Sequence, residues 1–326
     1  MTALSDVTIL VPGRLNPDTL AELKTLARVV ERPNGDISDL SEAERASVRG
    51  AAVMGVVSAA LMDALPNLEV VAHFGVGYDG VDVKHAVSRG IPVTNTPDVL
   101  TDEVADTTLG LLLMTARRLS AAERYLRAGR WAQEGHFPLT ETTLRGRSVG
   151  IMGLGRIGLA IAARLEPFGV SIAYFNRSER TDVSYPYFAT LGELADAVDT
   201  LIIAAPGGAG TEKAVNADVL KRLGSDGIFI NIGRGSIVDE DALVAALRDG
   251  TIKAAGLDVF ADEPRVREDL IALDNAVLLP HVASASRHTR AQMGSLVIEN
   301  LRRWFAGETL ATPVPEAQKA GLVKRP

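Results

Sequence analysis

Short apolar runs alternate with amphipathic stretches along most of this chain. A run of this kind indicates a strand, and apolar residues that recur every three or four positions indicate a helix. Strands and helices that alternate form parallel sheets covered by helices on both faces. The predicted strands occupy residues 7–11, 51–57, 68–73 and 91–94 in the first part of the chain, and 148–152, 170–175, 201–205, 228–232, 254–259 and 277–279 in the second.

This pattern predicts two doubly wound α/β sheets, the second with about six strands. A long helix over residues 101–118 links them, with Thr101 as its N-cap, acids in its first turn and arginines at its end. Further helices are predicted at residues 18–26, 82–88, 157–168, 218–223, 239–248 and 284–305. Residues 119–143 do not fit the pattern, and they form either an arm that packs on a second subunit or a solvated connection.

The stretch 148–178 predicts a ligand as well as a structure. Strand, helix and strand follow one another here, and the first turn reads GLGRIG at residues 153–158, a GxGxxG sequence. Gly153 allows the tight turn, Gly155 lets the backbone approach a pyrophosphate, and Gly158 lets helix and strand pack closely. The free N–H groups at the start of the helix then face the phosphates. Dinucleotide binding is therefore favoured over a purely structural turn.

The residues that close the second strand indicate which dinucleotide binds. An NAD site usually has Asp or Glu there for the ribose 2′-hydroxyl, whereas this chain has Asn176, Arg177 and Ser178, followed by Arg180. Arg177 offers a planar fork of donors and Ser178 a hydroxyl, which suit a 2′-phosphate. NADPH is the preferred prediction and NADH remains possible; the alternative is a solvated turn with an incidental arginine.

Composition narrows the function classes. Hydrophobic residues make up 47% of the 326 residues and charged residues 23%, and the net charge is −7. A large basic surface for nucleic acid or anionic membrane is not expected. The chain has no cysteine and only five scattered histidines, so no metal site is expected. No basic residue precedes the first apolar run and no segment has the ~20 apolar residues of a membrane span, which indicates a cytoplasmic protein.

Three polar residues follow strands of the second sheet. Arg234 follows the strand at 228–232, Glu263 follows 254–259, and His281 follows 277–279. The carboxyl ends of parallel strands form the ligand-facing edge, so these side chains are expected to converge near the nicotinamide. Each residue alone also has a structural explanation: Arg234 could only stabilise its loop, Glu263 could lie in a solvated turn, and His281 could be a structural histidine. Together they suit reduction of a 2-keto acid.

The roles follow from the chemistry of these groups. The Arg234 fork binds the substrate carboxylate and keto oxygen, a hydride attacks the carbonyl carbon, and His281 protonates the developing alkoxide. A carboxylate beside the imidazole favours its protonated form, and Glu263 is placed to supply it.

The glycines of the loop at residues 75–80 follow a strand of the first sheet, and they serve either a tight turn or an anion site.

Five segments resemble the D-isomer-specific 2-hydroxyacid dehydrogenase family. They are HFGVGYDGVD at 73–82, GLGRIG at 153–158, NIGRGSIVDEDAL at 231–243, GLDVFADEP at 256–264 and LLPHVASAS at 278–286. The segments NRS at 176–178 and PVPE at 313–316 are most similar to its glyoxylate/hydroxypyruvate reductase and hydroxyphenylpyruvate reductase branch.

The resemblance implies a role for individual residues. Arg234, Glu263 and His281 match the family's substrate-binding arginine, histidine partner and proton donor, and the Val76 and Gly77 amides match its carboxylate-binding loop. The cofactor residues that it implies, together with those of the glycine turn, are Gly153, Leu154, Gly155, Arg156, Ile157, Asn176, Arg177, Ser178, Pro206 as a wall, and Ile232 and Asp258 at the nicotinamide carboxamide.

The resemblance also implies an architecture and an assembly. It implies a flavodoxin-like substrate domain, residues 1–98 with 284–326, and an inserted Rossmann dinucleotide-binding domain, residues 99–283. It further implies a homodimer built through the dinucleotide domains.

Other functions compete with reduction of small 2-keto acids such as glyoxylate and hydroxypyruvate. One is reduction of aromatic 2-keto acids such as hydroxyphenylpyruvate. Oxidation of formate is disfavoured because Pro280 precedes His281 and no paired glutamine can be placed; phosphite is a further substrate to consider. A dinucleotide-sensing binding protein similar to corepressors is the alternative from another class. For the substrate pocket, Met54, Val56 and Val57 are candidates for its wall, and Phe137 for a residue that arrives from a second subunit.

Overall fold

The computed structural model describes residues 3–325. The chain divides into two compact units. Unit 1 combines the residues up to Leu100 with those from Ser286 onward, and unit 2 comprises Thr101–Ala285. Unit 1 is therefore made from both ends of the chain, and unit 2 is inserted between them.

Unit 1 contains a sheet of five parallel strands in the order β2-β1-β3-β4-β5. This is the flavodoxin-like order. The strands are β1 (Thr8–Pro12), β2 (Arg28–Arg32), β3 (Val48–Val53), β4 (Val70–His73) and β5 (Val93–Thr94). Strand β2 was not predicted, because its sequence RVVER is largely polar and it lies half-exposed at the sheet edge.

Helices cover both faces of this sheet. Helices α1 (Pro17–Leu26) and α13 (Arg287–Ala306) pack together, and α13 also contacts β4. The buried core that includes β1, β3 and β4 side chains also includes residues of α3 (Ala59–Asp63), α4 (Val83–Ser88) and α14 (Pro315–Lys319). The short elements η1 (Leu4–Asp6) and α2 (Glu42–Ser47) complete the unit. Helices α2, α3 and α14 were not predicted, since each spans little more than one turn.

Unit 2 contains a sheet of seven parallel strands in the order β12-β11-β10-β9-β6-β7-β8. This is the Rossmann order with one strand added at an edge. The strands are β6 (Ser148–Met152), β7 (Ser171–Phe175), β8 (Tyr187–Phe188), β9 (Thr200–Ile203), β10 (Ile228–Asn231), β11 (Ala254–Leu257) and β12 (Ala276–Leu278). The expected fold class is confirmed; the strand that the prediction missed is β8, which has only two residues.

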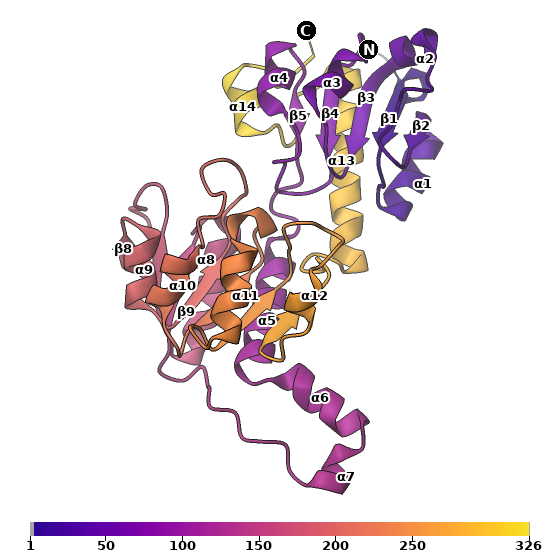
Figure 1. Ribbon diagram of the computed structural model, residues 1–326. Helices are drawn as coiled ribbons and strands as arrows, with labels where there is room; N and C mark the ends of the chain where they lie inside the picture. Colours follow the sequence, from indigo (N-terminus) through magenta and orange to yellow (C-terminus); the bar gives the residue numbers. More distant parts are fainter. Residues whose placement is uncertain (1–2, 326) are drawn as a thin grey trace. The chain divides into compact units, whose positions relative to one another are not determined.

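Two helical layers enclose the sheet of unit 2 (Figure 1). Helix α5 (Thr101–Ala116) packs on β10, β11 and β12 and on α8 (Arg156–Leu165), which continues into η2 (Glu166–Phe168). The other layer consists of α9 (Leu191–Ala197), α10 (Ala217–Leu223) and α11 (Glu240–Arg248), which contact one another in sequence. The remaining elements are η3 (Gly235–Ile237) and α12 (Glu268–Ile271).

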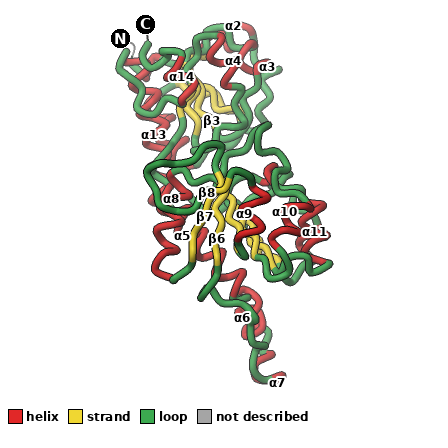
Figure 2. The backbone as a smooth tube through the Cα atoms, turned by 90° about the vertical axis from the view of Figure 1, so that its left-hand side faces the viewer, coloured by secondary structure: helices red, strands yellow, loops and turns green. Residues whose placement is uncertain are grey.

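Two short helices project from the body of unit 2, as Figures 1 and 2 both show. They are α6 (Leu119–Arg127) and α7 (Arg130–Glu134), followed by a long strand-free connection to β6. Their apolar side chains Leu126 and Trp131 are each 55% exposed. We call residues 119–143 the arm. Within residues 3–325 no helix has the length and apolar character that crossing a membrane requires.

Candidate active site

Three polar side chains lie in loops at one edge of the unit 2 sheet. Arg234 follows β10, Glu263 follows β11 and His281 follows β12. These strands are neighbours and run parallel, so their carboxyl ends open at the same edge.

Glu263 and His281 form a hydrogen-bonded pair. His281 Nδ1 and Glu263 Oε2 are 2.7 Å apart, and the second oxygen, Oε1, accepts the N–H of Phe260 at 3.0 Å. Phe260 thereby orients the carboxylate, and the carboxylate orients the imidazole. Because Nδ1 is engaged, Nε2 is the nitrogen that can exchange a proton with a ligand, and the His281 side chain is 48% exposed.

The charge state of Glu263 follows from its surroundings. Partial burial raises its pKa, but the hydrogen bonds from His281 and Phe260 and the charges of His281 and Arg234 outweigh burial. The pKa of Glu263 therefore lies below its usual value. A carboxylate that stays ionised near neutrality stabilises a protonated imidazole beside it.

Asp258 determines the backbone at His281. The main chain of His281 lies in the left-handed region, at φ 53°, which is unusual for a residue with a side chain. Its N–H donates to the Asp258 carbonyl at 2.9 Å, and the carboxylate of Asp258 accepts the N–H groups of Val282 and Ala283 at 2.7 and 2.9 Å. Asp258 is fully buried, and burial raises its pKa although these two hydrogen bonds oppose the shift. Sequence reasoning did not find this supporting contact.

Two hydrogen bonds made by the Asn231 side chain stabilise the loop that carries Arg234. The Asn231 side chain donates to the Arg234 carbonyl and accepts the N–H of Gly233, both at 3.0 Å. Arg234 itself donates to the Gly233 carbonyl at 2.7 Å and is half-buried. Gly235 next to it touches the main chain of Phe260, because a Cβ there would lie 1.8 Å from the Phe260 carbonyl carbon. The loops of Arg234 and Glu263 are therefore in direct backbone contact.

The three glycines of GLGRIG have three different surroundings. Gly153 has φ 97°, and a Cβ there would lie 2.6 Å from Ala205 N. A Cβ on Gly158 would lie 2.3 Å from the Gly153 carbonyl, so helix α8 lies directly against the turn. A Cβ on Gly155 would meet nothing within 4 Å. The open space at Gly155, at the N-terminus of α8 and at the point where the strand order reverses, fits a dinucleotide pyrophosphate.

The segment after β7 divides its side chains between the turn and solvent. Asn176 Oδ1 accepts the N–H of Leu154 at 2.7 Å, so both residues tie the glycine turn to β7. Arg180 pairs with Asp182 and donates to the Leu154 carbonyl at 3.1 Å. Arg177 and Ser178 are exposed, and within the described part of the chain the Arg177 guanidinium has no protein partner. Arg177, rather than Arg180, is thus available for an external anion.

Two further predicted residues lie at the same edge. Pro206 is exposed in the loop after β9, and Ile232 directly follows β10, with its N–H bonded to Ile203 O at 3.2 Å. The Ile232 side chain is buried, so only its main chain can serve a ligand.

In unit 1, the loop with Val76 and Gly77 follows β4. It packs against residues 54–57, since Val57 N donates to Gly80 O at 2.9 Å. Met54 and Val56 are 45% and 73% exposed. Val57, predicted as a pocket wall, is instead 1% exposed in the core of unit 1. Its N–H donates to the Gly80 carbonyl and its carbonyl accepts the N–H of Asp82, both at 2.9 Å.

Phe137 packs within its own arm. Its ring meets that of Tyr125 edge-on at 5.4 Å between centroids, and Arg118 lies 5.8 Å from the Phe137 centroid. Tyr125 in turn donates to the Gly135 carbonyl at 2.8 Å. These contacts hold the end of the arm back on α6.

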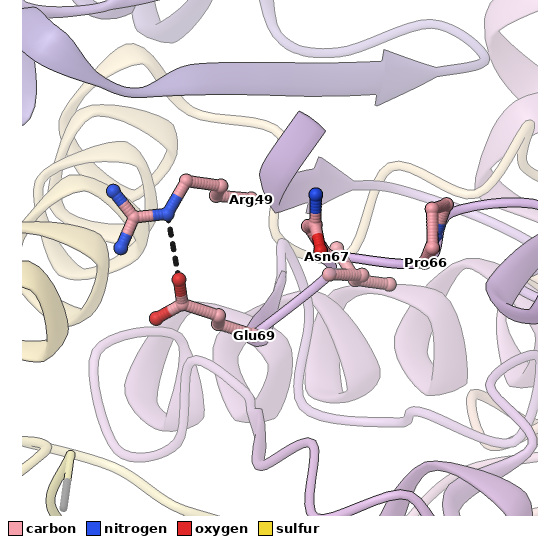
Figure 3. Close-up of a pocket in the computed structure, with 5 residues that line it drawn as sticks. Arg49, Pro66, Asn67 and Glu69 are labelled. Carbon is pink, nitrogen blue, oxygen red and sulfur yellow. Dashed lines mark hydrogen bonds and ion pairs between the residues drawn. The ribbon is translucent and has the colours of Figure 1, made fainter. Parts of the chain in front are cut away.

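A hollow in unit 1 has polar groups that satisfy one another. It is lined by Arg49, Pro66, Asn67, Leu68 and Glu69, and Figure 3 shows the Arg49 guanidinium pointing at the Glu69 carboxylate. The two are 2.6 Å apart, and Trp304 also donates to Glu69 at 3.3 Å. This hollow lies where β4 begins, opposite the end that carries Val76. Over residues 3–325, no three His, Cys, Asp or Glu side chains are grouped closely enough to bind a metal ion.

Comparison with known proteins gives consistent matches. Residues 109–283 match the D-isomer specific 2-hydroxyacid dehydrogenase family, NAD binding domain. The chain is 48% identical over 281 residues to glyoxylate/hydroxypyruvate reductase A of Arabidopsis thaliana, covering 85% of this chain and 88% of that protein. It is 49% identical over 256 residues to the hydroxyphenylpyruvate reductase of Plectranthus scutellarioides, covering 78% and 81%.

A solved structure matches the whole chain. It is the NADPH-dependent glyoxylate/hydroxypyruvate reductase of Sinorhizobium meliloti, in complex with NADP and malonate. The TM-score is 0.95 and the sequences are 56% identical, with 99% of each chain covered.

Proposed function

Because this chain belongs to the D-isomer-specific 2-hydroxyacid dehydrogenase family, we propose that it is an NADPH-preferring reductase of small 2-keto acids. It reduces glyoxylate to glycolate and hydroxypyruvate to D-glycerate. The observation that carries the proposal is the pair of Glu263 and His281, 2.7 Å apart at the ligand-facing edge of a Rossmann sheet.

The side chains divide the reaction among them. Arg234 binds the substrate carboxylate and keto oxygen with its planar fork, and the Val76 and Gly77 amides provide a second anchor for the carboxylate. When bound, the nicotinamide supplies a hydride to the carbonyl carbon. His281 gives its Nε2 proton to the carbonyl oxygen as negative charge develops there, and Glu263 stabilises the protonated imidazole until that moment. One keto acid, one hydride and one proton give one 2-hydroxy acid.

In the cofactor site, main-chain N–H groups bind the pyrophosphate, and side chains select NADPH over NADH. The N–H groups of Arg156 and Ile157 at the start of α8 face the pyrophosphate over the open space at Gly155. Arg177 and Ser178 read the 2′-phosphate of NADPH, and Asn176 and Leu154 hold the turn in shape. The residues that would hold the nicotinamide are Pro206, the Ile232 carbonyl and Asp258, whose buried carboxylate already accepts the N–H groups of Val282 and Ala283. NADH is the weaker cofactor.

The role of Arg177 predicts a change in cofactor choice. Replacing Arg177 with aspartate removes a charge-assisted contact and adds repulsion, so NADPH should bind more weakly by roughly 2 kcal/mol or more. NADH, which has no 2′-phosphate, should bind as before or better. Fluorescence titration with both cofactors checks this, and an equal loss for both would show that Arg177 does not read the phosphate.

The pairing of Glu263 with His281 predicts a pH effect. Reduction takes a proton from His281 and oxidation returns one to it, so the reduction rate should fall and the oxidation rate should rise as pH increases. Glu263→Gln removes a carboxylate whose lowered pKa keeps it ionised, and both profiles should move to lower pH. The matched control is Asp262→Asn, a neighbour that pairs with Arg265 at the surface. Profiles that stay in place in Glu263→Gln would remove Glu263 from this role.

Turnover measurements test the function itself. NADPH oxidation is measured with glyoxylate, hydroxypyruvate, pyruvate and phenylpyruvate. The carboxylate anchor is common to all four, and an apolar pocket discriminates by only about 1–3 kcal/mol per methylene, so more than one acid should react. Glyoxylate and hydroxypyruvate should give the higher kcat/KM, because they are the acids named for the relatives that are 48% and 56% identical. Activity restricted to aromatic acids would favour the hydroxyphenylpyruvate alternative that one relative represents. NADPH binding without turnover of any acid would favour a dinucleotide-sensing binding protein.

The assembly and location complete the proposal. Unit 1 is the substrate domain and unit 2 the dinucleotide-binding domain. The arm carries exposed apolar side chains at Leu126 and Trp131, which supports a homodimer built through the dinucleotide domains. Light scattering on the purified chain measures the dimer directly. A cytoplasmic location stays a prediction from the sequence.

A further inference from the structure

In the loop proposed to bind the substrate carboxylate, the carbonyl groups of Gly75 and Val76 each accept a hydrogen bond from a residue that follows β5. The ring nitrogen Nδ1 of His73 also lies 3.4 Å from the Gly75 carbonyl. The Gly75 carbonyl accepts the N–H of Thr96 at 3.0 Å, and the Val76 carbonyl accepts the side-chain amide of Asn95 at 2.8 Å. Both donors follow β5, which is the neighbour of β4 in the sheet. In the part of the chain that the structure describes, the N–H groups of Val76 and Gly77 donate to no protein acceptor.

Peptide geometry turns this support into an orientation. The peptide groups that join Gly75 to Val76 and Val76 to Gly77 are trans, so the C=O and N–H of each point in opposite directions. A carbonyl held by Thr96 therefore turns the Val76 N–H away from Thr96, and a carbonyl held by Asn95 turns the Gly77 N–H away from Asn95. The two amides that a carboxylate would accept are presented by bonds made on their far side.

Asn95 is itself held by the C-terminal segment. Residues 312–314 run antiparallel to residues 93–95, with Asn95 N bonded to Thr312 O at 3.2 Å and Val314 N to Val93 O at 3.0 Å. The Thr312 hydroxyl donates to the Asn95 carbonyl at 2.6 Å and accepts the side-chain amide of Asn300 at 2.8 Å. Asn300 is fully buried in α13, and its side-chain oxygen accepts the N–H of Thr312 at 3.1 Å. A continuous chain of hydrogen bonds thus runs from α13 to the Val76 carbonyl.

A second contact joins the same segment to the loop. The Tyr78 hydroxyl donates to Glu316 of α14 at 3.1 Å. Burial of Tyr78 and the neighbouring Glu316 carboxylate raise the pKa of the phenol to about 12, so it keeps its proton and remains a donor. The C-terminal segment therefore touches the loop at Tyr78 and supports it through Asn95 at Val76.

We propose that Asn95 is a positioning residue for substrate binding, which orients the Val76–Gly77 peptide so that its N–H meets the substrate carboxylate, and that Thr312 and Asn300 hold Asn95 in place. This inference rests on the proposed function of the loop. It assigns to residues outside the loop a part of the affinity for every 2-keto acid, because all of them share the carboxylate.

Matched variants test the inference. Asn95→Ala should raise the KM for glyoxylate and hydroxypyruvate about tenfold, the loss that one hydrogen bond to the loop predicts, with kcat within about threefold and NADPH affinity unchanged. Thr312→Val should raise KM about threefold, and Thr312→Ser, which keeps the hydroxyl, should restore it. The control is Asn67→Ala, because Asn67 also donates its amide to a main-chain carbonyl, that of Ala46 at 2.7 Å, but at the opposite end of β4. Its KM should match the wild type.

The outcomes separate this inference from the proposed function. The inference would be overturned by a wild-type KM in Asn95→Ala, or by equal KM values in Thr312→Ser and Thr312→Val. Turnover of glyoxylate by the wild type would still uphold the proposed function. If the wild type turns over no 2-keto acid, the proposed function is wrong. Crystal structures of the variants then test whether Asn95 orients the loop, independently of activity. The Val76–Gly77 peptide should then be rotated in Asn95→Ala and unchanged in Asn67→Ala; an unrotated peptide in Asn95→Ala overturns it.

Discussion

Replacing His281 with glutamine is expected to lower kcat for 2-keto acid reduction about a thousandfold, within the range that general acid catalysis contributes. Glutamine has a similar reach and can accept a hydrogen bond from or donate one to its neighbours, but it cannot release a proton to an alkoxide at neutral pH. NADPH affinity should stay within twofold of the wild type, because the glycine turn and Arg177 lie in other loops of unit 2. Stopped-flow measurement of NADPH oxidation separates the chemical step from binding.

A second histidine provides the control for this prediction. His288 lies in the first turn of α13 and is exposed, so His288→Gln should leave kcat within twofold of the wild type. Retention of more than a tenth of the activity in His281→Gln would mean that the proton comes from another group or from water, and the role proposed for His281 would be wrong.

Replacing Gly235 with alanine is expected to damage both stability and activity, although it adds a single carbon. The new Cβ would lie 1.8 Å from the Phe260 carbonyl carbon and 2.0 Å from its oxygen, and main-chain atoms cannot rotate away as a side chain can. The loops after β10 and β11 must then separate. We expect the free energy of unfolding to fall by about 3 kcal/mol or more, which corresponds to a decrease in Tm of roughly 6–12 °C for a unit of this size.

The same separation moves Arg234 away from Glu263. A displacement of about 1 Å in a positioned group can cost a hundredfold in rate, so kcat/KM should fall at least that much at temperatures where the protein is still folded. Ser236→Ala, at the next and exposed position, should change neither Tm nor kcat/KM. A wild-type Tm in Gly235→Ala, measured by calorimetry, would show that the two loops tolerate separation.

The sequence predicted most of the fold because the signals for strands and helices are local. A largely buried strand such as β6 or β10 contains a continuous apolar run, and such runs are visible in the sequence without any partner. Elements whose stability depends on their neighbours were missed. Strand β8 has two residues and exists because Tyr187 and Phe188 pair with the end of β7, and the polar edge strand β2 exists because β1 offers it a partner.

By itself, the sequence determined the class of the protein and the identity of its reactive groups. Arg234, Glu263 and His281 follow three strands that topology must align at one edge, so a rule about parallel sheets was sufficient to group them. The tertiary structure decided what holds each of them in place. Asp258 fixes the turn of His281, Asn231 and Gly235 fix the loop of Arg234, and Asn95 supports the loop of Val76. Apart from the local turn at Asn231, these contacts join residues whose separation along the chain carries no pattern. An asparagine or a buried aspartate has the same appearance in a sequence whether it supports a loop or binds a ligand. Only the positions of donors and acceptors in space distinguish the two, because a hydrogen bond depends on distance and direction and not on residue type alone.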